Sequence, residues 1–188
     1  MNATPQGERA RIVFAGRCNV GKSSLVNALA GQPVAVVSEV RGTTTDPVRK
    51  AMELLPLGPV LLCDTPGLDD DSRLGGLRME RTRGELRQAD LALVVADAAR
   101  GLGEVERLLL DEIRARGVPG VVAFNRADAG PVAPGALEEA KARGFPALAV
   151  SATAPSGIDE LKRAIVAALP EDGRGPRLAA ALVRWLSQ

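Results

Sequence analysis

From Gly16 to Ser23 the chain reads GRCNVGKS, which matches the pattern G-x-x-x-x-G-K-S/T at every fixed position. The apolar run Arg11–Ala15 before it predicts a buried strand, and Lys22–Ala30 predicts a helix that begins inside the pattern. Glycines at both ends of the loop let successive N–H groups face one anion, and the N-terminus of the following helix adds positive potential. A glycine-rich turn with a surface lysine is the structural alternative, but the strand and the helix around the pattern favour a phosphate-binding loop.

Two further features complete the predicted phosphate site. Lys22 supplies a compact cation for β- and γ-phosphates, and the Ser23 hydroxyl is a hard ligand suited to Mg²⁺. DTPG (Asp64–Gly67) ends a predicted strand, so Asp64 can hold the hydration shell of Mg²⁺ and the Gly67 N–H can reach a γ-phosphate. DTPG is also good turn chemistry, and its distance from the phosphate loop favours the functional interpretation. The predicted phosphate-binding residues are Gly16, Asn19, Val20, Gly21, Lys22, Ser23, Ser24 and Gly67.

A second polar group, NRAD (Asn125–Asp128), follows the apolar run Val121–Phe124. An aspartate at its end can accept hydrogen bonds from both the N1–H and the 2-amino group of guanine, and a site of this kind rejects adenine by roughly 10⁴-fold or more. Ser151-Ala152-Thr153 follows another apolar run and can offer a backbone N–H to guanine O6. Asn125 and Asp128 would also suit a strand-ending turn with a helix cap, but the order of the four motifs favours a guanine site. Its predicted residues are Asn125, Arg126, Asp128, Ser151 and Ala152.

The rest of the chain alternates short apolar runs with helical stretches. Further strands are predicted at Val48–Leu55, Val60–Cys63, Leu91–Ala96, Val121–Phe124 and Ala147–Val150, with a turn at Pro56–Pro59. Helices are predicted at Gly103–Arg116, at Pro134–Arg143, and from a capping box at Ser156–Asp159 to Leu169. This alternation predicts a mostly parallel sheet with helices on both faces. Gln32–Pro47 and Gly67–Gly76 are long polar loops, which are usually functional in compact domains.

Composition excludes several kinds of site. The 188 residues carry 24 Lys+Arg, 23 Asp+Glu and no His, so imidazole bases and histidine-ligated metals are excluded and broad polyanion binding is disfavoured. Two cysteines, Cys18 and Cys63, cannot form a four-thiolate cluster or a disulfide framework. No apolar run approaches the ~18 residues of a membrane span, and the polar start lacks a signal segment, which predicts a cytoplasmic domain without membrane contact. Residues 1–170 are expected to form one nucleotide-binding domain, and residues 171–188 a linker and a short helix leading toward further domains.

With its four motifs in this order, the chain resembles the translation-factor-class GTPases that include Era, Der and MnmE. A closer resemblance is to the GTPase domain of the HydF family of [FeFe]-hydrogenase maturation proteins. It rests on GRCNVGKSS (residues 16–24), RGTTTDP (41–47), KAMELLP (50–56), Gly58-Pro59 and GLDD (67–70), and it covers about Thr4 to Leu169. The resemblance implies a three-layer α/β P-loop NTPase fold, a Ras-like G domain, in which a mostly parallel six-stranded sheet has one antiparallel edge strand.

The same resemblance implies slow, Mg²⁺-dependent and K⁺-stimulated GTP hydrolysis by a switch domain in hydrogenase cofactor maturation. The implied partners are GTP and GDP, a dimerisation domain, a cluster-binding domain, the hydrogenase and other maturases. The cluster ligands of that family lie in its third domain, so no iron–sulfur cluster is expected in this sequence. The alternatives are a ribosome-assembly or tRNA-modification GTPase, and a non-catalytic GTP-binding module. An RNA-acting protein needs an RNA-binding module, and the sequence shows neither a basic stripe nor interleaved aromatic residues.

Several residue roles are also implied by the resemblance. Thr44 corresponds to the Mg²⁺ ligand of the first switch segment, although Thr43 and Thr45 carry equally suitable hydroxyls and only the register selects among them. Asn19 stands where MnmE-like relatives use an asparagine to help bind K⁺, a cation that can be worth about 10³–10⁵ in rate by analogy with an arginine finger. A loop-capping amide is its alternative role. The implied catalytic residues are Lys22, Asn19, Thr44 and Gly67.

The chain departs from these families at several positions. Arg126 replaces the usual lysine of the base motif, and either aliphatic stem can cover the face of guanine. HydF-like sequences usually read DTAG where this chain reads DTPG. Leu68 stands where Ras-like enzymes carry a water-orienting glutamine, and Gly76 falls where MnmE carries a water-positioning glutamate. Nucleotide-dependent changes are expected in Gln32–Pro47 and Gly67–Arg83. The open candidates for positioning the water are Asp69, Asp70, Asp71 and Glu80, with a solvated acidic face as the alternative.

Overall fold

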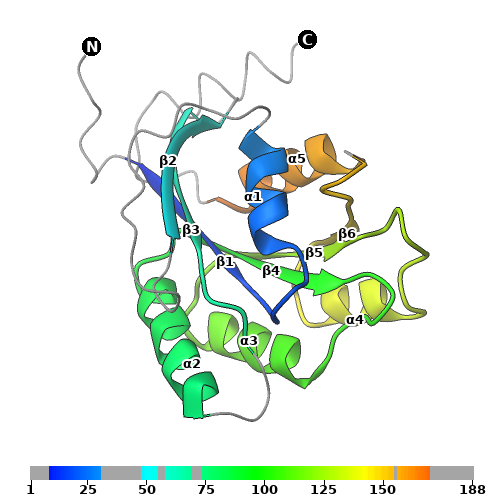
Figure 1. The fold of residues 1–188 in the computed structure, drawn as a ribbon, viewed down its shortest axis with the longest axis horizontal. Coiled ribbons are helices and arrows are strands. Elements are labelled where there is room, and N and C mark those ends of the chain that lie inside the picture. Colours follow the sequence, from blue (N-terminus) through cyan, green and yellow to red (C-terminus); the bar gives the residue numbers. More distant parts are fainter. Residues whose placement is uncertain (1–8, 31–47, 55–57, 69–72, 155, 170–188) are drawn as a thin grey trace.

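Six strands of the described chain form one sheet in the order β2-β3-β1-β4-β5-β6 (Figure 1). In the computed structural model they span Ala10–Ala15 (β1), Val48–Leu54 (β2), Gly58–Asp64 (β3), Leu91–Asp97 (β4), Gly120–Asn125 (β5) and Ala147–Ala149 (β6). Strand β2 runs antiparallel to β3, and the other neighbouring pairs are parallel. The structure describes residues 9–30, 48–54, 58–68, 73–154 and 156–169. The predicted sheet of six strands, with one antiparallel strand at its edge, is confirmed.

Five helices of the described residues cover the two faces of this sheet. They span Lys22–Ala30 (α1), Arg73–Leu86 (α2), Glu104–Ala115 (α3), Ala136–Ala142 (α4) and Ile158–Ala168 (α5). Helices α1 and α5 lie on one side of the sheet, and α2, α3 and α4 lie on the other (Figure 1). The arrangement is therefore the predicted three-layer α/β fold, with the helices as the outer layers.

The central strands are apolar on both faces because each face is covered by helices. Along β1, Ile12 and Phe14 belong to the core beneath α1 and α5, whereas Val13 and Ala15 belong to the core beneath α3 and α4. Every residue of β5 is buried, and so is every residue of β4 except the last. Such continuous runs are typical of parallel strands covered on two sides, which is why the sequence reveals them.

Two local predictions are wrong. Gly58 and Pro59 belong to β3, where they pair with Leu54 and Glu53, and so they are not part of a turn at Pro56–Pro59 as predicted. Residues 55–57 lie outside the described residues. The predicted capping box at Ser156–Asp159 does not form. Helix α5 instead follows Gly157, a left-handed residue (φ 70) without a side-chain cap. The close packing there requires glycine, because a Cβ would lie 2.4 Å from the carbonyl oxygen of Ala149.

Helix α2 occupies a segment for which the sequence predicts only a loop and a switch region. Of the apolar side chains that the structure describes in this helix, Leu86 is fully buried and Met79 is partly buried against the core. Polar contacts also attach the helix to the sheet. Glu85 is buried, accepts a hydrogen bond from Arg49 of β2, and lies 4.0 Å from the guanidinium of Arg11 in β1. Both ion pairs join residues far apart in sequence, which explains why local patterns miss this helix.

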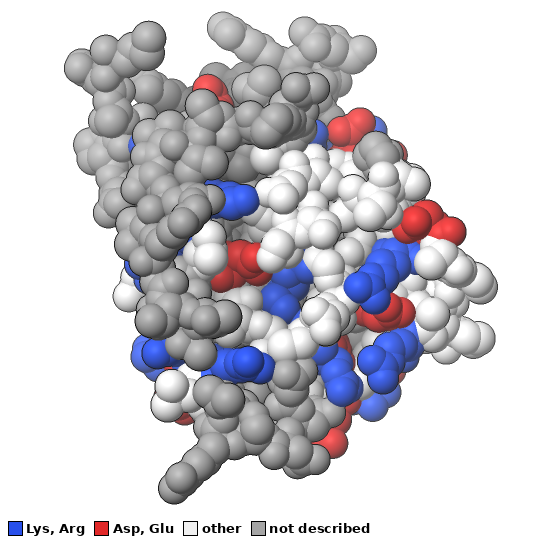
Figure 2. Space-filling model, in the orientation of Figure 1, with Lys and Arg blue, Asp and Glu red and all other residues white. Residues whose placement is uncertain are grey.

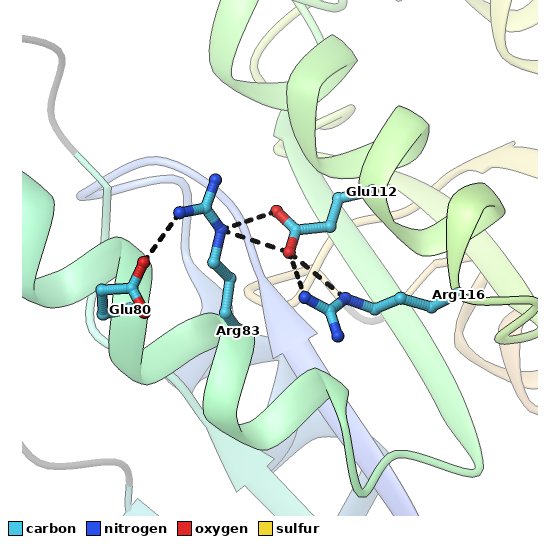
Figure 3. A network of polar contacts seen from close by, with 4 residues as sticks. All are labelled: Glu80, Arg83, Glu112 and Arg116. Carbon is cyan, nitrogen blue, oxygen red and sulfur yellow. Dashed lines mark hydrogen bonds and ion pairs between the residues drawn. The ribbon is translucent and has the colours of Figure 1, made fainter.

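A network of four charged residues joins α2 to α3 (Figure 3). Arg83 of α2 donates from Nε to both carboxylate oxygens of Glu112 in α3, at 3.0 and 3.2 Å, and from Nη1 to Glu80 at 2.8 Å. Arg116 donates to the same Glu112 carboxylate at 2.6 Å. Burial raises the pKa of Glu112, but the hydrogen bonds from Arg116 and Arg83 outweigh it and hold that pKa below the ordinary value.

Glu112→Gln is expected to lower the free energy of unfolding by about 0.5–1 kcal/mol, since partly exposed ion pairs contribute little. A carboxylate whose pKa is lowered by folding stabilises the fold above its unfolded pKa and loses that contribution as the pH falls through the folded value. The difference in urea midpoint between the two proteins should therefore be present at pH 7 and shrink below about pH 4. Glu80→Gln, which removes a 66%-exposed partner of Arg83, is the control. An equal loss in both variants would contradict the central role of Glu112.

Candidate functional site

The loop between β1 and α1 has the conformation that its glycines predict. Gly16 (φ 149) and Gly21 (φ 88) both adopt backbone conformations that favour glycine. A Cβ on Gly16 would lie 2.2 Å from the carbonyl oxygen of Val95, and one on Gly21 would lie 2.4 Å from Nδ2 of Asn125. The loop therefore packs closely against β4 and against the end of β5, and glycine is required at both positions.

Lys22 is the first residue of α1 and is only 7% exposed. Its Nζ donates to the carbonyl oxygens of Arg17 at 2.8 Å and Gly16 at 3.2 Å, so the ammonium lies against the loop that precedes the helix. A compact cation and the N-terminus of a helix at one loop form a site suited to a polyphosphate. Ser23 and Ser24, the next two residues, are exposed in the first turn of α1.

Asp64, the last residue of β3, lies beside the start of α1. The Ser23 hydroxyl donates to its Oδ2, while its Oδ1 is buried without a hydrogen-bond partner among the described residues. Burial raises the pKa of Asp64, against the lowering effects of the Ser23 hydrogen bond and the Lys22 and Lys50 charges. A buried carboxylate oxygen without a partner, next to a hydroxyl, is a donor set that fits a hard divalent cation such as Mg²⁺. The predicted third ligand, Thr44, lies outside the described residues.

Gly67 and Leu68, which follow Asp64, lie against the phosphate loop. The Leu68 N–H donates to the Gly16 carbonyl at 3.1 Å, and the Cys18 N–H donates to the Leu68 carbonyl at 3.3 Å. Gly67 approaches so closely that a Cβ would lie 2.5 Å from Cα of Cys18. The Leu68 side chain is 2% exposed and belongs to the core, so this position presents no polar side-chain group to a water.

The candidates for positioning the attacking water remain open. Gly76 is an exposed residue of α2, and a Cβ there would meet nothing within 4 Å. Glu80, one turn further along, is 66% exposed and pairs with Arg83. The acidic run Asp69–Asp71 lies outside the described residues.

Asn125, the last residue of β5, ties the predicted phosphate and base loops together. It is 2% exposed, and its Nδ2 donates to the Val20 carbonyl at 2.9 Å. Its Oδ1 accepts from the N–H of Ala152 at 3.2 Å. The Ala152 N–H that the sequence assigns to guanine O6 is therefore engaged by Asn125, so binding of O6 requires it to share or exchange that bond.

Asp128 is an exposed carboxylate held by two hydroxyls. Ser151 donates to its Oδ1 at 2.5 Å, and Thr153 donates to its Oδ2 at 3.3 Å. The Ser151 hydrogen bond holds the pKa of Asp128 below its ordinary value, so both oxygens are acceptors at neutral pH. The sequence predicts only a backbone donor in the loop that holds Ser151 and Thr153. It does not predict the two hydroxyl contacts to Asp128.

The Arg126 guanidinium makes contacts that the sequence does not predict. Its backbone is left-handed (φ 66), and its guanidinium donates to the Asn19 carbonyl in the phosphate loop. Its Nη1 also lies 3.2 Å from Oδ2 of Asp97, at the end of β4. Asn19 is itself left-handed (φ 59) and exposed. No sequence motif identifies Asp97 as part of this site.

The predicted residues that the structure describes lie at the carboxyl ends of β1, β3, β5 and β6, where ligands bind in open α/β sheets. On the face shown in Figure 2, acidic and basic side chains of the described residues lie next to one another rather than in separate fields. None of the helices within the described residues has both the length and the apolar character needed to cross a lipid bilayer.

A family model described as "50S ribosome-binding GTPase" matches residues 11–126, a range that contains the phosphate loop, DTPG and Asn125. The chain is 35% identical over 181 residues to the tRNA modification GTPase MnmE of Neisseria meningitidis serogroup C, covering 96% of this chain and 39% of that protein. It is 45% identical over 122 residues to MnmE of Nitrosococcus oceani, covering 64% of this chain and 26% of that protein. The chain thus spans less than half the length of these relatives.

Solved structures show the same relationship. Era in complex with MgGDPNP and a segment of 16S ribosomal RNA superposes with a TM-score of 0.70 at 28% identity, covering 93% of this chain and 65% of that one. Era of Aquifex aeolicus bound to GDP and AlF4⁻ gives a TM-score of 0.69 at 29% identity, covering 89% and 59%. The chain therefore belongs to the 50S ribosome-binding GTPase family and is a GTPase domain of the Era and MnmE type.

Proposed function

We propose that this chain is a Mg²⁺-dependent, K⁺-stimulated GTP-hydrolysing switch domain of a larger cytoplasmic protein. The observation that carries the proposal is the bridge through Asn125, whose amide contacts both the phosphate loop at Val20 and the base loop at Ala152. One residue thus sets the spacing between a polyphosphate site and a carboxylate suited to guanine. In this proposal residues 1–170 form the nucleotide-binding domain, and residues 171–188 lead toward further domains.

Hydrolysis would proceed by in-line attack of water on the γ-phosphate, with charge developing on the phosphoryl oxygens. The Lys22 ammonium and the N–H groups of the loop would stabilise this charge, and the Gly67 N–H would bind a γ-phosphate oxygen. Mg²⁺, held through Ser23, Thr44 and the carboxylate of Asp64, would neutralise charge on the β- and γ-phosphates when bound. Leu68 offers no polar side chain, so a separate group must orient the water.

Binding is tested by calorimetry with Mg²⁺ and a matched pair of nucleotides. GTP should bind and ATP should not, because the N1–H and 2-amino donors that Asp128 accepts are absent from adenine. Equal uptake of both nucleotides, or of neither, would overturn the proposal. Tight GTP binding without phosphate release in K⁺ would select the alternative of a non-catalytic binding module.

Hydrolysis should be slow and faster in KCl than in NaCl at the same ionic strength. The Asn19 side chain is exposed, and no hydrogen bond to a described residue engages its amide, so it is available to a monovalent cation near the phosphate loop. In Asn19→Ala the factor by which K⁺ raises turnover should fall at least about 10-fold. This is a small part of the rate increase that a cation at this position can supply. Affinity for GDP should change little. Equal turnover in the two salts would exclude the Asn19 assignment.

Asp64→Asn should stabilise the metal-free fold while weakening Mg²⁺-dependent hydrolysis. Since burial raises the pKa of Asp64, the ionised carboxylate destabilises the metal-free fold above that pKa, and this cost disappears as the pH falls through it. The variant should therefore melt at a higher temperature than wild type at pH 7 without nucleotide, and the difference should shrink as the pH is lowered.

With GTP and Mg²⁺ present, wild type should instead melt at the higher temperature. Hydrolysis by Asp64→Asn should fall by roughly 10²-fold or more. Asp111→Asn is the matched control. It breaks a surface pair between Asp111 in α3 and Arg143, which follows α4, and it should leave Mg²⁺-dependent hydrolysis unchanged. Full activity of Asp64→Asn in Mg²⁺ would contradict the assignment of this carboxylate to the metal site.

We further infer that the process served is tRNA modification, because the relatives at 35–45% identity are named tRNA modification GTPase MnmE. This inference replaces hydrogenase maturation as the leading interpretation. Hydrogenase maturation remains the second candidate on one observation, the block GTTTDPVRKAMELLPLGP at residues 42–59. In that second case the partners would be dimerisation and cluster-binding domains, the hydrogenase and other maturases.

A domain exchange distinguishes these candidates. The chain would replace the GTPase domain of MnmE in a strain that lacks MnmE, and that of HydF in a strain that lacks HydF. Recovery of modified tRNA, read by mass spectrometry of nucleosides, with no recovery of hydrogenase activity, is the expected result. The opposite pattern would overturn the tRNA assignment and leave GTP hydrolysis intact.

A further inference from the structure

Arg126 contacts two segments that belong to different motifs. Its Nη2 donates to the carbonyl of Asn19 in the phosphate loop, and its Nη1 lies 3.2 Å from Oδ2 of Asp97 at the end of β4. The two contacts use different nitrogens, so the planar guanidinium makes both at once. Base loop, phosphate loop and β4 are thereby joined through a single side chain, which is 49% exposed.

Asp97 is a fixed anchor for this contact. Its Oδ1 accepts from the Ala99 N–H at 3.1 Å, and its backbone carbonyl accepts from the N–H groups of Arg100 at 3.2 Å and Gly101 at 3.0 Å. Its side chain is 16% exposed. In the β4–β5 register Asp97 also pairs with Asn125, the residue that bridges the two loops. The carboxylate that faces Arg126 is therefore held from both its side chain and its backbone.

Asn19 is the residue that needs such support. Its φ of 59 is a left-handed conformation, which is uncommon for residues other than glycine although asparagine tolerates it. The Arg126 hydrogen bond fixes the direction of the Asn19 carbonyl and with it this turn of the phosphate loop. Lysine, which the related motif usually carries here, has its three N–H donors on one nitrogen, so it cannot present two separate nitrogens to the two acceptors as the guanidinium does.

We propose that Asp97 is a positioning residue for nucleotide retention, acting through Arg126. It holds the guanidinium on the Asn19 carbonyl, and this brace preserves the spacing between the guanine site and the phosphate loop while nucleotide is bound. The inference rests on the proposed guanine-nucleotide site and extends it to a residue outside the four motifs. Its expected consequence is slow release of GDP.

The test is the dissociation rate of a fluorescent GDP analogue from the full chain, followed by stopped flow. Asp97→Asn should accelerate release about 3- to 10-fold, a modest factor because the pair is partly exposed. Asparagine can keep the Ala99 contact through Oδ1 while its amide N–H₂ faces the guanidinium, so the melting temperature without nucleotide should stay within about 2 °C. Asp97→Glu should recover part of the slow release.

A double-mutant cycle identifies the route of the effect. Arg126→Met keeps an unbranched apolar side chain and removes the guanidinium, so adding Asp97→Asn to it should change the release rate less than about 2-fold. Asp111→Asn, which breaks the 2.9 Å pair with Arg143 away from the site, is the matched control and should release GDP like wild type.

Unchanged release in Asp97→Asn, or a full additional effect on the Arg126→Met background, would overturn the inference. Wild-type chain that binds no GDP would overturn the proposed function, and this inference with it.

Discussion

Asp128→Asn should lose GTP and bind xanthosine triphosphate instead. The Asp128 carboxylate is expected to accept from guanine N1–H and the 2-amino group, whereas asparagine would accept from N1–H and donate to the carbonyl that xanthine carries at C2. A site built for a given donor pattern rejects the wrong one strongly, so GTP affinity should fall by roughly 10³- to 10⁴-fold. Calorimetry with both nucleotides in Mg²⁺ measures the exchange directly.

The surroundings of Asp128 make this substitution well tolerated by the fold. Ser151 and Thr153 contact the two carboxylate oxygens from one loop. In the asparagine variant the remaining oxygen can still accept from Ser151, and the amide N–H₂ can donate to the Thr153 hydroxyl. The change is therefore one of donor pattern and not of structure. Asp159→Asn, an equally exposed change in α5, is the control. Unchanged GTP affinity in Asp128→Asn would contradict the guanine assignment.

The phosphate loop could be predicted from sequence because its requirements are local. Gly16 and Gly21 are dictated by backbone conformation, and Lys22 and Ser23 follow them at the start of the helix. The central strands could be predicted equally well, since burial on both faces leaves continuous apolar runs such as Leu91–Ala96 in the sequence. Both signals lie within a few consecutive residues.

The remaining features depend on contacts between distant residues. Arg126 and Asp97 are 29 positions apart and meet because β4 and β5 are neighbours in the sheet. Helix α2 is attached through Glu85 and Arg83, whose partners lie in β2 and α3, so no local pattern predicts these contacts. At Ser156 the sequence suits a capping box, but packing of Gly157 against the Ala149 carbonyl sets the start of the helix.

Lys22→Met should remove most of the affinity for the triphosphate while leaving the fold intact. Lys22 is 7% exposed, and methionine is an apolar residue of similar length that suits a buried position. Loss of a buried cation that is proposed to contact the phosphate oxygens should reduce GTP affinity by roughly 10²- to 10³-fold and hydrolysis further. Lys162→Met is the control, since Lys162 pairs with Asp159 within α5 at 3.5 Å, outside the phosphate loop. It should bind GTP like wild type.

The two large effects should also be independent of each other. In the proposed site Lys22 contacts the phosphates and Asp128 contacts the base. Lys22→Met should therefore weaken the binding of GTP and of xanthosine triphosphate equally when it is placed on the Asp128→Asn background. Residual binding to Lys22→Met alone should still favour guanine over adenine nucleotides, because the donor pattern read by Asp128 is unchanged. If Lys22→Met lost its preference for guanine over adenine nucleotides, the phosphate-binding and guanine-binding parts of the site would not be independent. Their coupling would then exceed what the Asn125 hydrogen bonds to the two loops explain.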